Sequence, residues 1–158
     1  MSVVRAYERA RGAAMTDVSG GRDHRLLMAL EGLGIIPPRV PSADLISVLG
    51  DDTRCIEVKG RGSSGPLSII ERQRDTFMAA GPLAWLYVVW NTTQPGPYLL
   101  ILVQDPERLA WVQTRAAERE PGMARGTRHE AAFECQSEEV ERLGMEVDLS
   151  DLDLPEKH

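Results

Sequence analysis

The chain has only two cysteines, no histidines at metal-ligand spacing and no long apolar run. Its two cysteines, Cys55 and Cys135, are too few for a disulfide framework or a four-cysteine zinc site. The three histidines show no metal-ligand spacing with one another or with the cysteines, so we expect no zinc site. No apolar run approaches the ~20 residues that a membrane span needs, and the N-terminus lacks a signal-peptide pattern. We therefore expect a cytoplasmic protein with free thiols and no membrane partner.

Size and composition are those of a soluble globular domain. The chain has 158 residues, of which 42% are hydrophobic and 27% are charged, so one compact domain is expected over residues 1–145. The net charge of −6 is unevenly distributed. Residues 130–158 contain ten acidic and two basic residues, a net −8, which leaves +2 for residues 1–129. We interpret residues 146–158 as an acidic C-terminal tail, and the mildly basic remainder permits contact with a phosphate backbone.

The stretch 43–59, ADLISVLGDDTRCIEVK, has the pattern of a β-hairpin around a Gly-Asp-Asp turn. The period of two in a strand places Cys55, Glu57 and Lys59 on one face of the second strand. Asp44 is available from the first strand. One carboxylate from each strand, with a lysine beside them, can hold a hard divalent cation next to a phosphate. Cys55 is interpreted as a small packing residue, because no histidine lies nearby in the sequence.

The segments around the hairpin predict an α/β fold. Segment 84–91, AWLYVVWN, is apolar along almost its whole length, as is typical of a strand covered on both faces. A helix between the hairpin and this strand makes a crossover, so the two strands should lie near each other in a mixed sheet. Segment 98–104 is predicted to form a hairpin with 84–91, and AAFEC a short edge strand. Helices are predicted over 2–12, 22–33, 68–80, 105–119 and 137–143.

Two further groups of polar residues have a structural and a functional interpretation. Glu8 lies among arginines in the first predicted helix, and it either belongs to a solvated charge-pair helix or adds a metal or water ligand over the hairpin. Glu31 is a second acid before the hairpin. In the glycine-rich loop after the hairpin, Arg61, Ser63 and Ser64 either meet a phosphate oxygen or form an ordinary surface turn. The loop lacks the spacing of a Walker motif, which excludes an NTPase of that kind.

An acid in one strand, followed about a dozen residues later by E-x-K in the next, is the arrangement of the PD-(D/E)XK nuclease superfamily. Within it, the chain resembles the NO VEIN C-terminal domain family, helicase-associated modules related to Mrr-like restriction endonucleases. The resemblance covers roughly residues 3–110. Six segments carry it: YERARG (7–12), DVS (17–19), ADLISV (43–48), RCIEVKGRGSSGPLSI (54–69), WLYVVWN (85–91) and QDP (104–106).

The resemblance implies a restriction-endonuclease-like fold, with a mixed central sheet of about four to five strands flanked by helices. It places the metal aspartate at Asp44, the E-x-K at Glu57 and Lys59, and the acid of the N-terminal helix at Glu8. Gln73 is placed where some relatives of the superfamily have a glutamine, and it is expected to bind nucleic acid together with Arg61, Ser63 and Ser64. Mg²⁺ or Mn²⁺ is the implied cofactor, because a carboxylate site accepts either ion. The segment 22–41 is longer than the family pattern.

Three functions follow for testing. The first is a Mg²⁺-dependent DNA endonuclease domain of a restriction or phage-defence system, with a possible homodimer for double-strand cutting. The second is a catalytically silent nuclease-fold module that binds nucleic acid or a partner protein such as a helicase. The third is a free-standing small protein whose acidic tail masks the site or docks on a basic partner. Fold likeness alone does not choose between them.

Overall fold

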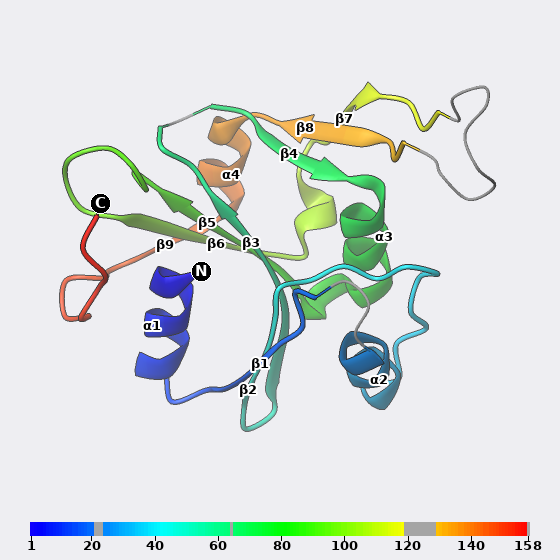
Figure 1. The fold of residues 1–158 in the computed structure, drawn as a ribbon, viewed down its shortest axis with the longest axis horizontal. Helices are drawn as coiled ribbons and strands as arrows, with labels where there is room; N and C mark the ends of the chain where they lie inside the picture. Colours follow the sequence, from blue (N-terminus) through cyan, green and yellow to red (C-terminus); the bar gives the residue numbers. More distant parts are fainter. Residues whose placement is uncertain (21–23, 64, 119–128, 158) are drawn as a thin grey trace.

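The computed structural model describes residues 1–20, 24–63, 65–118 and 129–157, and the strands among them form two sheets (Figure 1). The larger sheet has six strands in the order β1-β2-β3-β5-β6-β9, and the smaller has three in the order β4-β8-β7. The strands of the larger sheet are β1 (Ala14–Asp17), β2 (Leu45–Leu49), β3 (Asp52–Gly60), β5 (Ala84–Trp90), β6 (Leu99–Gln104) and β9 (Met145–Val147). Those of the smaller sheet are β4 (Leu67–Ile70), β7 (Val112–Arg115) and β8 (Ala132–Cys135).

Strand β3 lies in the middle of the larger sheet, antiparallel to β2 and parallel to β5. The predicted hairpin over 43–59 and the crossover from it to segment 84–91 are therefore confirmed. The hairpin of 84–91 with 98–104 is confirmed as well, because β5 and β6 pair in antiparallel register. The mixed central sheet flanked by helices that was predicted for a restriction-endonuclease-like fold is present. A short strand at each edge, β1 and β9, extends it beyond the predicted four to five strands.

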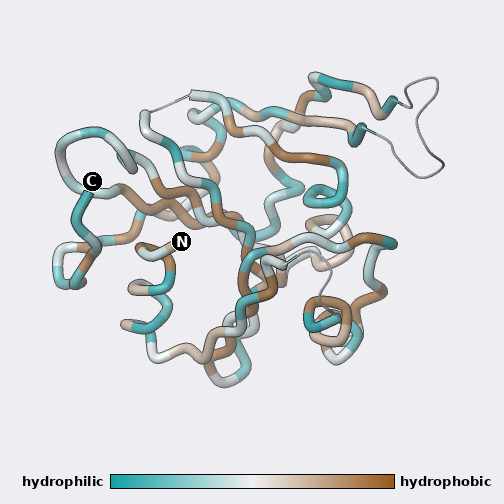
Figure 2. The backbone as a smooth tube through the Cα atoms, in the orientation of Figure 1, coloured by the Kyte–Doolittle hydropathy of each residue, from teal (hydrophilic) through white to brown (hydrophobic). Residues whose placement is uncertain are grey.

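The four helices of the described residues lie on the two faces of this sheet. They are α1 (Ser2–Ala10), α2 (His24–Gly32), α3 (Glu71–Ala80) and α4 (Ser137–Leu143). Helix α1 packs on the face of β3 that carries Ile56, together with Tyr87 and Val89 of β5. Helices α2, α3 and α4 and the smaller sheet pack on the opposite face, which carries Cys55 of β3 and Leu86 of β5 (Figure 1). In Figure 2 the hydrophobic stretches follow the central strands, as burial on both faces requires.

Two predicted helices are wrong at the positions of the smaller sheet. The predicted helix 68–80 begins as strand β4, and helix α3 starts only at Glu71. The predicted helix 105–119 is a single 3₁₀ turn, η2 (Pro106–Arg108), followed by strand β7. Both errors have one cause: β4 and β7 each pair with β8, and this pairing between distant segments overrides local helical periodicity. The predicted edge strand AAFEC is accordingly the central strand of the smaller sheet.

The residues predicted to form an acidic tail contact the domain. Residues 145–147 form edge strand β9 beside β6, and Leu149 is buried. Leu152 and Leu154 pack against the apolar cluster on the α1 side of the sheet. Among the described residues, no helix combines the length and the apolar character that crossing a bilayer would require.

Gly144 provides a test of the packing between α4 and the sheet. A Cβ atom at this position would overlap the side chain of Ile101 and lie 2.5 Å from the carbonyl oxygen of Val140. We expect Gly144→Ala to lower the free energy of unfolding by about 1–3 kcal/mol, the usual cost of overpacking. Urea denaturation followed by circular dichroism measures it. Gly32→Ala, where a Cβ would meet nothing within 4 Å, is the matched control and should not lower stability. Equal stability of the two variants would contradict the packing described.

Candidate functional site

Asp44, the residue immediately before β2, lies close to Glu57 of β3, since its carboxylate raises the pKa of Glu57. The backbone amide of Asp44 donates to the carbonyl of Ile56 at 2.8 Å, so the chain is already joined to β3 at the residue before β2 begins. Asp44 Oδ2 accepts a hydrogen bond from the amide of Val58 at 2.8 Å. The second oxygen, Oδ1, receives no donor from the part of the chain that the structure describes. A backbone contact thus fixes the Asp44 carboxylate beside β3 and leaves one oxygen for a ligand.

Glu57 is a buried carboxylate in the middle of the sheet. It pairs with Leu86 in the parallel β3–β5 register, so it points toward the face that α3 covers. Its exposed fraction is 5%, and its Oε1 lies 3.2 Å from Lys59 Nζ. Lys59 is two residues further along the strand and shares that face. The structure therefore brings together Asp44, Glu57 and Lys59.

Gln73 completes the group from helix α3. Its side-chain amide Nε2 donates to Glu57 Oε1, and its Oε1 accepts from Lys59 Nζ at 3.1 Å. The same Oε1 accepts from the backbone amide of Ile70 at 3.0 Å, which closes the first turn of α3. These three contacts determine the orientation of the amide. Gln73 therefore ties the start of α3 to the acid and the lysine of β3.

The negative charge of Glu57 is only partly compensated by its surroundings, and its pKa is raised. Burial raises the pKa of Glu57 to about 7, from an ordinary value of 4.5. Lys59 lowers the pKa, and the neighbouring Asp44 raises it. A cation that binds between two close carboxylates offsets both the cost of burying their charge and the repulsion between them.

The residues present fit a hard divalent cation. Mg²⁺ in phosphate-processing sites is commonly held by one or two carboxylates, with waters and phosphate oxygens at the other positions. Asp44 and Glu57 supply two neighbouring carboxylates, each with an oxygen that no donor from the described residues occupies. Within the described ranges no group of three or more His, Cys, Asp or Glu side chains is placed to hold a metal. Asp44 and Glu57 are therefore the two carboxylates that the described part of the chain brings together for such an ion.

Glu8 lies on the opposite face of the sheet, apart from Glu57. Its Oε2 accepts from Ser47 Oγ at 2.5 Å and from Arg11 Nη1 at 2.6 Å, and its Oε1 accepts from Tyr87 OH at 2.5 Å. Arg54 Nη1 donates to the same Tyr87 hydroxyl at 2.7 Å. The Glu8 side chain is fully buried. The structure gives Glu8 a complete set of partners that joins α1 to the sheet, and it does not bring Glu8 to the other predicted ligands.

The remaining predicted residues lie near the site or away from it. Arg61 follows Lys59 by one strand period, and its amide bonds to the carbonyl of Val89, so the β3–β5 ladder continues past Gly60. Ser63 is exposed in the loop that follows, and Ser64 lies outside the described residues. Glu31 is exposed on α2. Burial raises the pKa of Cys55 to about 12, which keeps it a thiol at neutral pH and agrees with a packing role.

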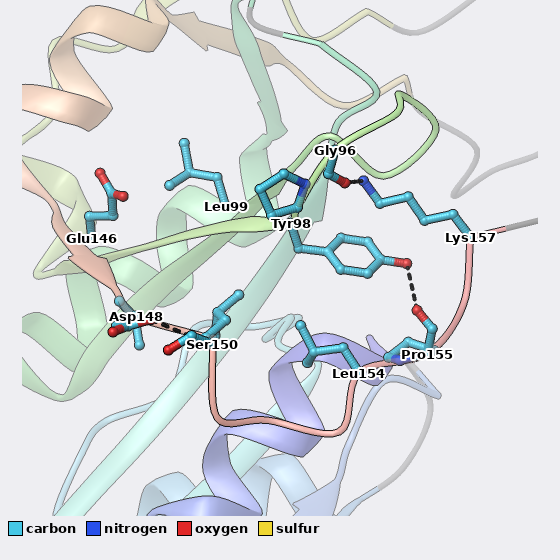
Figure 3. A pocket seen from close by; sticks show the side chains of 12 residues that line it. Gly96, Tyr98, Leu99, Glu146, Asp148, Ser150, Leu154, Pro155 and Lys157 are labelled. Atoms are coloured by element: carbon cyan, nitrogen blue, oxygen red, sulfur yellow. Dashed lines mark hydrogen bonds between the residues drawn. The ribbon is translucent and has the colours of Figure 1, made fainter.

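Of two cavities among the described residues, one adjoins the group of Asp44, Glu57, Lys59 and Gln73, and the other lies away from it. A cavity of about 510 Å³ is lined by Lys59 and Gln73 together with residues of the smaller sheet. A cavity of about 700 Å³ lies between β6, β9 and the C-terminal segment (Figure 3). There Lys157 Nζ donates to Gly96 O at 2.6 Å, and Tyr98 OH donates to Pro155 O at 3.3 Å. These bonds hold the acidic segment at the far end of β6, so it does not cover the Glu57 face.

Several polar residues near the site were not singled out from the sequence. Arg115, Thr114 and Glu134 line the first cavity from β7 and β8. Nothing in their local sequence indicates this position, because β8 reaches the site by pairing with β4, and β7 reaches it by pairing with β8. The approach of Arg54 to Glu8 was likewise missed, whereas Arg11 is one of the arginines that the charge-pair interpretation of the first helix includes. The arginines that flank Glu8 in the sequence were the only available signal, and they indicate a charge pair without its burial.

Comparisons with known proteins are sparse. No protein-family model and no curated protein match the chain. One solved structure to which it is similar is a Holliday junction resolvase from Archaeoglobus fulgidus, an archaeal hyperthermophile. The identity is 22%, the match covers 81% of this chain and 91% of the resolvase chain, and the TM-score is 0.39. The resemblance to the NO VEIN C-terminal domain family stays a prediction.

The raised pKa of Glu57 makes stability depend on pH. A neutral Glu57 is favoured in the folded protein, so its stability contribution is complete below about pH 4.5 and is lost as pH rises through about 7. We expect the metal-free protein to lose stability over this window relative to Glu57→Gln, which cannot titrate there. Urea denaturation of both proteins in EDTA at a series of pH values measures it. A constant difference in unfolding free energy across the window would contradict this burial effect.

The buried contacts of Glu8 predict a structural role that can be separated from metal binding. Removing one member of a buried charge network typically costs about 3–5 kcal/mol, so Glu8→Ala should lower the free energy of unfolding by about that amount. Glu31→Ala, an exposed acid, should change it by less than about 0.5 kcal/mol. Mn²⁺ titration of the folded Glu8→Ala fraction should give wild-type affinity. A large loss of Mn²⁺ affinity without a loss of stability would instead make Glu8 a ligand.

Proposed function

We propose that this chain is a metal-dependent DNA endonuclease that hydrolyses phosphodiester bonds. The observation that supports it is the closeness of Asp44 to Glu57, with Lys59 and Gln73 bonded to the same Glu57 oxygen. Two carboxylates and a lysine at this spacing match the needs of phosphodiester hydrolysis, in which negative charge on the phosphate must be neutralised and a water activated.

Asp44 and Glu57 would hold Mg²⁺ or Mn²⁺. When bound, such an ion neutralises the phosphate and lowers the pKa of a water. Lys59 would be the positioning group: its side chain is 22% exposed, and its ammonium could orient a water or stabilise charge that develops on the phosphate oxygens. Gln73 keeps the Lys59 and Glu57 side chains at a fixed separation, because it bonds to both. Fixed geometry of this kind accounts for a large part of catalytic rate.

The wider setting of the proposal rests on the resemblance to helicase-associated, Mrr-like modules. It suggests a restriction or phage-defence system, with DNA as substrate and a helicase or another defence subunit as partner; the free thiols and the lack of a signal-peptide pattern suggest the cytoplasm. A homodimer would supply the second site that cutting of both strands needs. Arg61, directly after β3, and Ser63, in the loop that follows, would contact the DNA backbone. The same role is proposed for Ser64.

Cleavage of supercoiled plasmid and of single-stranded DNA, with Mg²⁺ or Mn²⁺ and with EDTA, tests the proposal. We expect metal-dependent cutting by the wild type. Asp44→Asn, Glu57→Gln and Lys59→Met should each lower the cleavage rate at least about 100-fold, because each removes a group that acts on the reacting phosphate. Glu31→Gln is the matched control for loss of an acid and should cut at the wild-type rate.

Mn²⁺ titration calorimetry on the same proteins separates the alternatives. Wild-type Mn²⁺ binding that is lost in Glu57→Gln, without cutting of either DNA, would support a metal-binding module that does not cleave by itself. Absence of both cutting and Mn²⁺ binding would overturn the nuclease and leave the catalytically silent module that binds nucleic acid or a helicase. Cutting that survives in Glu57→Gln would move the active site elsewhere.

A further inference from the structure

The cavity beside the candidate site is built by the smaller sheet. Its volume of about 510 Å³ falls in the range of about 300–1,000 Å³ that is usual for small-ligand pockets. Lys59 and Gln73 belong both to this cavity and to the group around Glu57. A ligand in the cavity would therefore lie directly next to the phosphate on which Asp44, Glu57 and Lys59 are proposed to act.

Alternate residues of β4 lie on opposite faces of the smaller sheet, one toward the core and one away from it. Leu67 and Ile69 of β4 are buried in the core shared with α3, and Ile69 also borders the cavity. The alternate residues Ser68 and Ile70 lie on the other face, and β8 pairs them with Glu134 and Ala132. The cavity thus has an apolar part, from Ile70 and Ala132, next to a polar part with a carboxylate.

The polar groups of the cavity include a carboxylate, which can bind a hydrogen-bond donor, as well as an arginine, which can bind a phosphate. Ser68 Oγ donates to Glu134 Oε1 at 3.1 Å, which fixes the carboxylate and leaves its Oε2 without a donor from the described residues. A carboxylate repels phosphate but accepts a hydrogen bond from the exocyclic amino group of a base, as Glu does with cytosine N4. Arg115 is held by bonds of 3.2 and 3.1 Å from its Nε and Nη2 to Glu130 O. Its remaining nitrogen can meet a phosphate at the cavity edge.

We propose that this cavity receives an unpaired nucleobase next to the cleaved phosphodiester, with Glu134 accepting from its amino group and Arg115 contacting the adjacent phosphate. The inference rests on the proposed nuclease function and names its substrate class. A base can enter such a cavity only when it is out of the duplex stack, so the substrate is single-stranded or carries a base that is extruded at the cut. Cytosine offers an amino group, whereas the N–H of thymine lies between carbonyl oxygens that a carboxylate repels.

Binding without cleavage tests the inference separately from catalysis. Fluorescence anisotropy in EDTA compares labelled oligodeoxycytidylate and oligothymidylate on the wild type, Glu134→Gln and Arg115→Ala. We expect the wild type to bind the cytidylate roughly 5- to 100-fold more tightly, the usual discrimination of one good base contact. Glu134→Gln, whose amide can also donate to a thymine carbonyl, should lose most of this preference. Arg115→Ala should weaken both oligonucleotides about equally.

Matched controls remove the same charges elsewhere. Glu146→Gln is the control for Glu134→Gln, because Glu146 lines the distant cavity (Figure 3). Arg9→Ala is the control for Arg115→Ala, because Arg9 is on α1, on the opposite face of the larger sheet. Both should bind as the wild type does. Equal affinity of the wild type for the two oligonucleotides, or an unchanged preference in Glu134→Gln, would overturn the inference even if the protein cuts DNA. A preference that Glu134→Gln abolishes would support it even if no cutting is seen, and absence of all oligonucleotide binding would overturn it.

Discussion

The pairing of β3 with β2 on one side and β5 on the other is the constraint on which the rest of the structure depends. Successive residues of β3 point to opposite faces, so this register sends Glu57 and Lys59 toward α3 and sends Ile56 toward α1. A slip of one residue would exchange the two sets and bury Lys59 in the apolar cluster under α1. The large apolar side chains of β5 on both faces make that exchange costly, since each fits only one of the two packing layers.

The two faces carry two buried carboxylates with different surroundings. Glu8 has four donors or cations around it and joins α1 to the sheet, as a satisfied buried charge does. Glu57 has Gln73 and Lys59 on one oxygen, and burial raises its pKa to about 7. An under-compensated acid of this kind, bonded to two residues that line a cavity, is a common mark of a functional site. The same residue type therefore stabilises the fold on one face and offers ligand oxygens on the other.

The smaller sheet forms the wall of the cavity next to Lys59 and Gln73. The turn from β4 into α3 delivers Gln73 to Glu57, and strands β8 and β7 continue the wall that begins at Lys59. The combination explains why one cavity contains both a catalytic lysine candidate and a carboxylate that suits a base. The C-terminal segment occupies the other end of the larger sheet, where Lys157 and Pro155 hold it against the turn before β6.

The central hairpin, the crossover to the buried strand and the face shared by Glu57 and Lys59 could be predicted from the sequence. They depend on period-two patterning and on an apolar run, which are local properties of the chain. Three features emerged from the folded chain: 67–70 and 112–115 are strands, Gln73 reaches Glu57, and Glu8 lies on the far face. Those outcomes depend on pairing between segments tens of residues apart and on which side of the sheet a helix packs. No local period encodes either choice, so they were decided by the burial of apolar surface and the satisfaction of buried charges in the folded chain.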